Sequence, residues 1–323
     1  GLQDLKKDDI CHASVLGRAQ TKSLGEVAPL KCEVNKFCVS DSNGKCEEVF
    51  VGEKINKISL SSKETEALDT TQRLIAERMY RCWKVMGEGK LDLFGNFGTS
   101  IGWDSAKPLC VICSRIAYDF KDNTAKERLF RNMNLEKYLA ENIPIDEEDI
   151  TYTQAFLNDP NFPAGYVVPS PESLEEQEEL YRELQSSGAE LIDLTSKDDM
   201  AVVFMQIKTP KYSDALKKIG EISAGVSASS FMLPVIGSGI GPGGAVLGAK
   251  ASAVVTISAL ALGTAQSVNA YFKVKEGRSA AAGYCGKVTA TLEEAKNGCS
   301  VVEVMPYDKR AIDALCYKTE ELQ

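Results

Sequence analysis

Two cysteines separated by two residues, Cys110 and Cys113, form the spacing in this chain that most suggests chemistry. A Cys-x-x-Cys pair can cycle between dithiol and disulfide, which is the chemistry of a thiol–disulfide protein. Eight further cysteines favour structural disulfides, and redox activity is the alternative interpretation. A zinc site made by Cys32, Cys38, Cys110 and Cys113 is a second alternative, although the five-residue gap after Cys32 is longer than zinc motifs usually have.

Few other residues of the chain could carry catalysis. His12 is the only histidine, so any scheme that needs a histidine base or metal ligand depends on this one side chain beside Cys11. The segment Gly239–Gly244 matches the G-x-G-x-x-G pattern of dinucleotide-binding loops, but Pro242 interrupts it and no acidic residue follows at the required distance. We therefore predict that the protein is not an enzyme and has no cofactor, no bound metal and no catalytic residue.

The cysteines fall into two groups, seven in the first third of the chain and three near its end. An even total of ten is typical of a disulfide framework formed in an oxidising compartment. Because seven and three are both odd, at least one disulfide must join the two groups if all ten cysteines pair. The predicted structural disulfides use Cys11, Cys32, Cys38, Cys46, Cys82, Cys110, Cys113, Cys285, Cys299 and Cys316.

Such a framework predicts an extracellular or cell-surface location. The sequence begins at Gly1 without an apolar leader, and we expect that an N-terminal signal or anchor has been removed. The net charge of −9 is concentrated between Glu141 and Asp199, where sixteen acidic residues accompany two basic ones. An acidic surface of this kind argues against nucleic-acid binding, which requires a basic face.

The regular elements that must position these residues follow from hydrophobic spacing and from helix start and stop signals. Ser61 and Glu64 predict a capping box at the start of a helix, and Gly87–Gly89 predicts its end. Between them, apolar residues recur at helical spacing at Leu68, Ile75, Met79, Cys82 and Met86. Further helices are predicted at 124–141 and 171–188, and strands at 37–39, 48–51, 201–207 and 299–305. An apolar run at 109–113 leads into a second one at 116–118.

These elements predict an α+β fold, a disulfide-stapled mixed domain that also carries an apolar helical hairpin rich in Ala, Gly and Ser. We expect a cysteine-rich N-terminal domain at residues 1–120 and an acidic region of helices and strands at 121–210. The apolar hairpin would occupy residues 211–280. A C-terminal cysteine-containing segment, 281–323, would pack back on the N-terminal domain.

The least ordinary feature of the chain is the stretch from Ile222 to Phe272, which contains one charged residue, Lys250, among 51 residues. Its second half, Ala251–Phe272, would span about 33 Å as a helix, which is the thickness of a bilayer core. Its many Ala, Ser and Thr residues make it less lipophilic than a Leu-rich anchor, so burial between proteins and contact with lipid remain equal alternatives. The predicted assembly or membrane face consists of Ala251, Val255, Ala259, Gly263 and Ser267.

Several short motifs resemble those of a group of uncharacterised exported archaeal proteins. The motifs are the segments Cys82–Trp83, Gly87–Phe94, Pro29–Cys32 and Cys110–Ile116, and an ending with Cys299, Pro306, Tyr307 and Cys316. The resemblance implies export and attachment to the cell surface, and it implies no activity.

We therefore expect a self-associating structural protein of the cell exterior, such as a filament, tube or coat subunit, whose partner is a second copy of itself. The segment 222–272 would be buried between subunits or against a lipid bilayer. The alternatives are a membrane-inserting or pore-forming exported protein, and an extracytoplasmic thiol–disulfide protein that uses Cys110 and Cys113.

Overall fold

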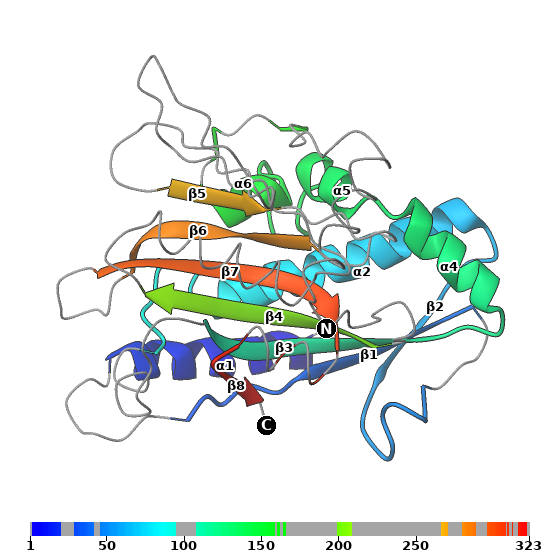
Figure 1. The fold of residues 1–323 in the computed structure, drawn as a ribbon, viewed down its shortest axis with the longest axis horizontal. Coiled ribbons are helices and arrows are strands. Elements are labelled where there is room, and N and C mark those ends of the chain that lie inside the picture. The colour runs from blue at the N-terminus through cyan, green and yellow to red at the C-terminus, as the bar shows by residue number, and fades with distance from the viewer. Residues whose placement is uncertain are drawn as a thin grey trace, which may run out of the picture.

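The computed structural model describes residues 2–20, 29–41, 46–94, 108–158, 160, 161, 164, 165, 199–208, 266–270, 280–288, 296–307, 309, 312 and 316–321. These residues have the predicted α+β fold, with helices packed beside a mixed sheet (Figure 1). The helices are α1 Leu2–Gln20, α2 Glu64–Val85, α4 Asn123–Asn132, α5 Leu135–Glu141 and α6 Tyr152–Leu157. The strands are β1 Asn35–Ser40, β2 Asn56–Ser59, β3 Leu109–Asp119, β4 Asp199–Lys208, β5 Gln266–Ala270, β6 Ala280–Val288, β7 Lys296–Pro306 and β8 Lys318–Glu321.

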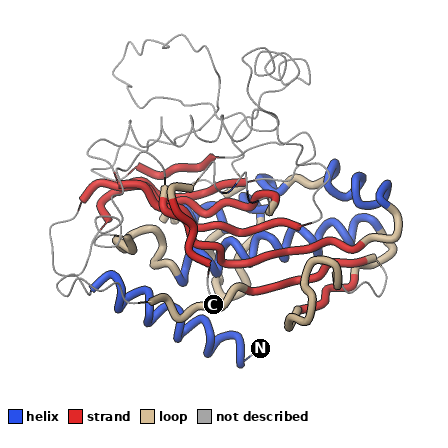
Figure 2. Tube along the Cα trace, turned by 60° about the horizontal axis from the view of Figure 1, so that its bottom comes forward, coloured by secondary structure: helices blue, strands red, loops and turns tan. Residues whose placement is uncertain are grey.

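The described strands form one eight-stranded sheet in the order β2-β1-β3-β4-β7-β6-β5, and β8 pairs with β3 outside this path. β1 runs parallel to both β2 and β3, and β8 runs parallel to β3. The strands from β3 through β4, β7, β6 and β5 are antiparallel to their neighbours. Figure 2 shows the strands in red as one layer, with α1 below it beside the label N. One sheet therefore contains strands from the beginning, middle and end of the chain.

The long helix α2 packs against this sheet because its apolar side chains recur at helical spacing. Ile75, Met79 and Trp83 are at most 1 % exposed and share a core cluster with Phe204 of β4. Burying side chains of this size stabilises a fold by about 1.5–3 kcal/mol each. The predicted helix is confirmed.

The predicted capping box at the start of α2 is wrong. The N-cap residue is Lys63, and no side chain caps the helix. Ser61 lies two residues before this N-cap, and its hydroxyl donates instead to the carboxylate of Glu66, at 2.7 Å. The helix start is therefore supported by its acidic first turn, which interacts favourably with the helix dipole.

After α2 the chain makes a tight turn that is held against the sheet. Gly89 has a φ of 72°, and a Cβ atom there would lie 2.4 Å from the Trp83 ring. The turn is fixed from below by the fully buried Gln206 of β4, which accepts a hydrogen bond from the Leu93 amide and donates one to the Leu91 carbonyl. These bonds satisfy a buried amide side chain, so the turn and the sheet fold as one unit.

Strand β3 contains a β-bulge that shifts by one residue the alternation of its side chains between the two faces of the sheet. Ile112 pairs with Val203 of β4 and Ser114 with Val202, so Cys113 is the extra residue. Before the bulge, Leu109, Val111 and Cys113 belong to the core under α2; after it, Ile116 and Tyr118 do. The bulge thus keeps both halves of an 11-residue strand facing the same core.

Four further points need correction within the described residues. Residues 2–20, where no element was predicted, form helix α1, and its buried apolar residues Cys11, Val15 and Ala19 recur every four residues. Residues 48–51 form a turn and not a strand. The helix predicted at 124–141 is two helices, because the Asn134 side chain caps α5 by accepting from the Lys137 amide at 3.0 Å.

The fourth correction concerns the end of the uncharged stretch. Gln266–Ala270 forms strand β5 and pairs with β6, so the predicted helix does not extend to Phe272. The hydrogen bonds of an adjacent strand override a helical pattern that depended on spacing alone. The predicted acidic helix at 171–188 and the remainder of the predicted hairpin lie outside the described residues.

Candidate functional site

Four disulfides tie the ends of the chain and the long helix to the sheet. Cys11–Cys32 joins α1 to the segment before β1, and Cys38–Cys46 joins β1 to the turn that follows it. Cys82–Cys113 joins α2 to β3, and Cys110–Cys316 joins β3 to the segment before β8. The last of these links the two cysteine groups, as their odd counts require. Multiple disulfides are compatible with an extracellular location.

The two cysteines of the Cys-x-x-Cys motif are bonded to different partners. Cys113 faces the core under α2, whereas Cys110 lies on the other face of β3. Residues three apart in a strand point to opposite faces, so the two sulfur atoms cannot meet. A redox pair made of Cys110 and Cys113 is therefore contradicted. The zinc alternative is contradicted too, because Cys32, Cys38, Cys110 and Cys113 belong to four separate disulfides.

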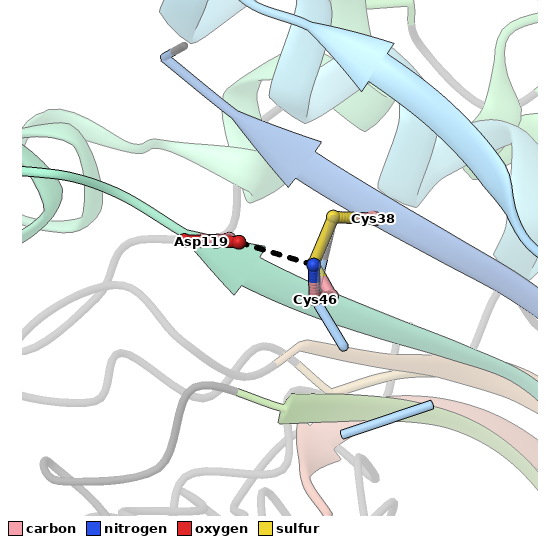
Figure 3. Close-up of side chains that lie close together, drawn as sticks. All are labelled: Cys38, Cys46 and Asp119. Carbon is pink, nitrogen blue, oxygen red and sulfur yellow. Dashed lines mark hydrogen bonds between the residues drawn. A yellow bond between two sulfur atoms is a disulfide. The ribbon is translucent and has the colours of Figure 1, made fainter. Parts of the chain in front are cut away.

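Cys38, Cys46 and Asp119 place two sulfur atoms and a carboxylate close together at the end of β1 (Figure 3). The two sulfur atoms are bonded to each other, so neither is a thiolate that could hold a metal. The carboxylate accepts a hydrogen bond from the Cys46 amide at 3.0 Å, and Cys46 has a φ of 47°. The Asp119 carboxylate therefore stabilises the turn at Cys46, whose backbone has the left-handed conformation.

A small cleft of about 30 Å³ opens beside the bulge of β3, between α1, α2 and β1. Both residues of the Cys82–Cys113 disulfide line it, together with Cys11. Its charged lining residues are Asp8, Glu33, Arg78 and Arg81, two acids and two bases. The cleft therefore places a disulfide beside two guanidinium groups, which makes it the described part of the chain best equipped for chemistry.

The two arginines of the cleft are held by contacts on different sides. Arg81 donates to the Asp8 carboxylate at 2.9 Å and lies 3.9 Å from the Asp146 carboxylate. Its Nε is buried without a hydrogen-bond partner among the described residues. The Arg78 guanidinium stacks over the Phe37 ring, 5.0 Å from its centroid. Stacking and pairing fix both cations in place beside the disulfide.

The single histidine lies close to this cleft but has a structural contact. His12 Nδ1 is 2.9 Å from the carbonyl oxygen of Val85, the last residue of α2 and itself part of the cleft lining. The ring donates to a helix carbonyl that lacks an intrahelical partner. His12 thus ties α1 to the end of α2.

A second polar cluster anchors the acidic loop after α5 to α2. The buried Glu77 carboxylate accepts from the Tyr152 hydroxyl at 2.5 Å and from the Ile145 amide at 2.8 Å. The Tyr80 hydroxyl bonds to Glu147. Burial raises the pKa of Tyr80 and Tyr152 well above the usual range, and their carboxylate partners raise it further.

A third polar cluster, around Arg115 of β3, ties β3 to Asp199 at the start of β4. The Arg115 guanidinium lies between the rings of Phe50 and Tyr307, 5.0 Å and 4.0 Å from their centroids, and bonds to the carboxylate of Asp199. Burial raises the pKa of Asp199, and the bond from Arg115 offsets part of that effect. Neither this cluster nor the Glu77 cluster was predicted from the sequence. Single charges inside apolar runs, such as Arg115 within β3, are the signal that could have indicated buried pairs.

Comparisons with known proteins assign no role to these clusters. No protein-family model, curated protein or solved structure matches this chain. Within the described residues, the helices are all too short or too polar to cross a membrane.

The predicted assembly face is placed in part. Ser267 lies in β5, whereas Ala251, Val255, Ala259 and Gly263 lie outside the described residues. The strands fix where the chain leaves and rejoins the sheet around this segment. β4 ends at Lys208 and β5 begins at Gln266.

Both of these points lie at the same end of the sheet. Lys208 pairs with Gly298 of β7, Gly298 with Gly286 of β6, and Cys285 with Gln266. Figure 1 shows the same arrangement, since β4 points toward the side from which β5 starts. Three strand spacings separate the two points, a distance of about 14 Å. The 57 residues 209–265 therefore form an insertion with both ends on one side of the sheet.

Proposed function

We propose that this chain is an exported, non-enzymatic structural protein that self-associates at the cell surface or outside the cell. The observation that carries the proposal is the insertion 209–265, which leaves and rejoins one end of a sheet stapled by disulfides. Most of the stretch 222–272, whose one charged residue is Lys250, belongs to this insertion. A stapled sheet can present such a segment to a partner without unfolding itself.

The composition of the segment favours contact with a second copy of the chain. Its small residues let backbones approach closely, and an uncharged surface of this length is unfavourable when it faces water alone. The same segment could contact lipid, which is the membrane-inserting alternative. The two functions differ in what they require, because self-association needs no bilayer.

A charge placed in the segment tests the proposal. Ala259→Glu would bury a carboxylate in any apolar interface, which costs several kcal/mol, about 3 or more. Wild type should sediment as a large assembly without detergent, and Ala259→Glu as a monomer. The matched control is Ala13→Glu at an exposed position of α1, which should leave the assembly unchanged.

Two outcomes would contradict the proposal. A wild-type protein that is monomeric without detergent, yet floats with lipid vesicles, would establish the membrane-inserting alternative. A wild-type protein that neither assembles nor binds vesicles would exclude both functions. In each case intact disulfides, checked by mass, would show that the folded sheet is not at fault.

A further inference from the structure

We propose that the Cys82–Cys113 disulfide is a thiol–disulfide exchange site that accepts small thiols through the cleft beside β3. This inference is independent of the proposed assembly function. It replaces the Cys110 and Cys113 pair suggested by the sequence with a different pair, which a helix and a strand bring together.

Access distinguishes this disulfide from the other three. Both Cys82 and Cys113 line the cleft, whereas the Cys11–Cys32 pair contributes Cys11 alone. Cys113 and Cys82 are 7 % and 4 % exposed, against 6 % and 2 % for Cys11 and Cys32 and 0 % for Cys110. A thiol that enters the cleft therefore meets the sulfur atoms of Cys82 and Cys113.

Cys113 has no register partner on the described strands that pair with β3, whereas the other residues of β3 do. Cys113 is the extra residue of the bulge opposite β4. On the other edge of β3, the pairing with β8 ends at Ile112 and the pairing with β1 starts at Ser114. Bulges are common beside active sites because they re-aim a side chain. Cys113 can thus shift on reduction without breaking a strand pair.

The cations of the cleft favour the charged species of an exchange reaction. Arg78 and Arg81 line the cleft beside the sulfur atoms, and nearby guanidinium groups stabilise thiolates. Asp8 pairs with Arg81 from the α1 side and keeps that cation in place. The attacking thiolate and the leaving thiolate are both anions, so both gain from the two guanidinium groups, while the carboxylates of Asp8 and Glu33 oppose part of that gain.

The exchange is balanced by two equivalents of an external thiol. The first thiolate attacks one sulfur of the pair, the sulfur–sulfur bond breaks, and a mixed disulfide and a cysteine thiolate form. The second thiolate attacks the external sulfur of the mixed disulfide. The external thiols leave as a disulfide, and Cys82 and Cys113 take up two electrons and two protons as free thiols.

Differential alkylation of the native full chain tests the proposal, with dithiothreitol as the thiol. The protein is exposed to graded dithiothreitol without denaturant and alkylated, and each cysteine is then assigned by peptide mass mapping. Cys82 and Cys113 should be alkylated first, at least about tenfold faster than Cys110 and Cys316. Equal rates for all pairs would indicate reduction through global unfolding and would overturn the proposal, as would faster reduction of any other pair.

A charge variant tests the role of the cleft. Arg81→Gln should slow reduction of the pair by about three- to tenfold, and Arg81→Lys should restore most of the rate because it keeps the cation. The matched control is Arg128→Gln on an exposed position of α4, which should leave the rate unchanged. Unaltered protection of the Cys110–Cys316 pair in each variant confirms that the protein is folded. An unchanged rate in Arg81→Gln would contradict the role of the guanidinium.

Discussion

Gly89 and Gly52 have nearly the same backbone conformation in different surroundings, with φ of 72° and 70°. A Cβ atom at Gly89 would meet the Trp83 ring at 2.4 Å, whereas nothing lies within 4 Å of one at Gly52. Both Ala variants have the cost of a left-handed residue, about 1 kcal/mol. Gly89→Ala should cost a further 1–3 kcal/mol, roughly, because the core must move.

Urea unfolding of the two variants at neutral pH measures this difference directly. The comparison removes the backbone cost, since it is common to both positions. A Gly89→Ala variant no less stable than Gly52→Ala would mean that the turn is not packed on Trp83 in solution.

The buried tyrosines give the protein a characteristic response to alkaline pH. Burial raises the pKa of Tyr138 to about 12, and it raises those of Tyr80 and Tyr152 further. In the unfolded chain these phenols ionise near pH 10, about their ordinary value. The folded state therefore binds more protons above that pH, so these tyrosines should leave the free energy of unfolding unaffected below about pH 10 and make it fall above that pH.

Unfolding by urea at a series of pH values checks this expectation. Tyr152→Phe should reduce the alkaline slope, because one of the raised pKa values has been removed. At neutral pH the same variant should lose about 1–2 kcal/mol, since the Glu77 carboxylate loses a hydrogen bond while it stays buried. An unchanged slope would place Tyr152 in contact with water.

Among the elements, β3 shows how far a local pattern can be interpreted. Its apolar run is a signal for a buried strand, although no strand was predicted there, and β3 occupies it. In a strand, the spacing of Cys110 and Cys113 excludes a bond between them, because residues three apart face opposite sides. The bulge could not be predicted, since it depends on the register with β4. Likewise the buried apolar residues described in α1, namely Cys11, Val15 and Ala19, are few for a polar helix of 19 residues, which is a weak signal.

Strands β6 and β7 predict a fifth disulfide. Eight of the ten cysteines are in the four described disulfides, and the other two, Cys285 and Cys299, are register partners on these adjacent strands. We expect a cross-strand bridge between them, which non-reducing peptide mapping would reveal as one linked pair of fragments. Recovery of either cysteine as an alkylated thiol from the untreated protein would disprove the bridge.

For the whole molecule, the disulfides differ in how much chain each one restrains. Cys110–Cys316 closes 206 residues, and Cys38–Cys46 closes 8. The chain-entropy relation assigns about 5 kcal/mol to the larger loop and about 2.5 kcal/mol to the smaller. Replacing Cys110 and Cys316 by Ala should therefore lower the melting temperature more than replacing Cys38 and Cys46.

Calorimetry of the two double variants provides the measurement. The C-terminal segment has a second attachment in the partly buried ion pair of Arg18 and Glu320, with a 2.8 Å hydrogen bond, so β8 should remain docked after the bridge is lost. If the smaller loop proved the more stabilising of the two, the entropic account of these bridges would not hold for this fold.

The global arrangement was the part least accessible to sequence. Local patterns predicted several helices and strands and the need for a link between the cysteine groups. The pairing of β4 with β7, about a hundred positions apart, and of β8 with β3 depends on contacts that no short motif encodes. For the same reason the cleft, built from four separate segments of the chain, was not predicted.

The bridge between Cys110 and Cys316 has a consequence for survival outside the cell. It makes everything between these two residues a closed covalent ring, and the long insertion after β4 lies within it. A protease that cuts the insertion opens the ring but releases no fragment, because both pieces stay joined through the sulfur atoms. Cleaved protein should therefore migrate as one chain without reductant and as two with it, and damaged subunits would stay attached to any assembly they had already joined.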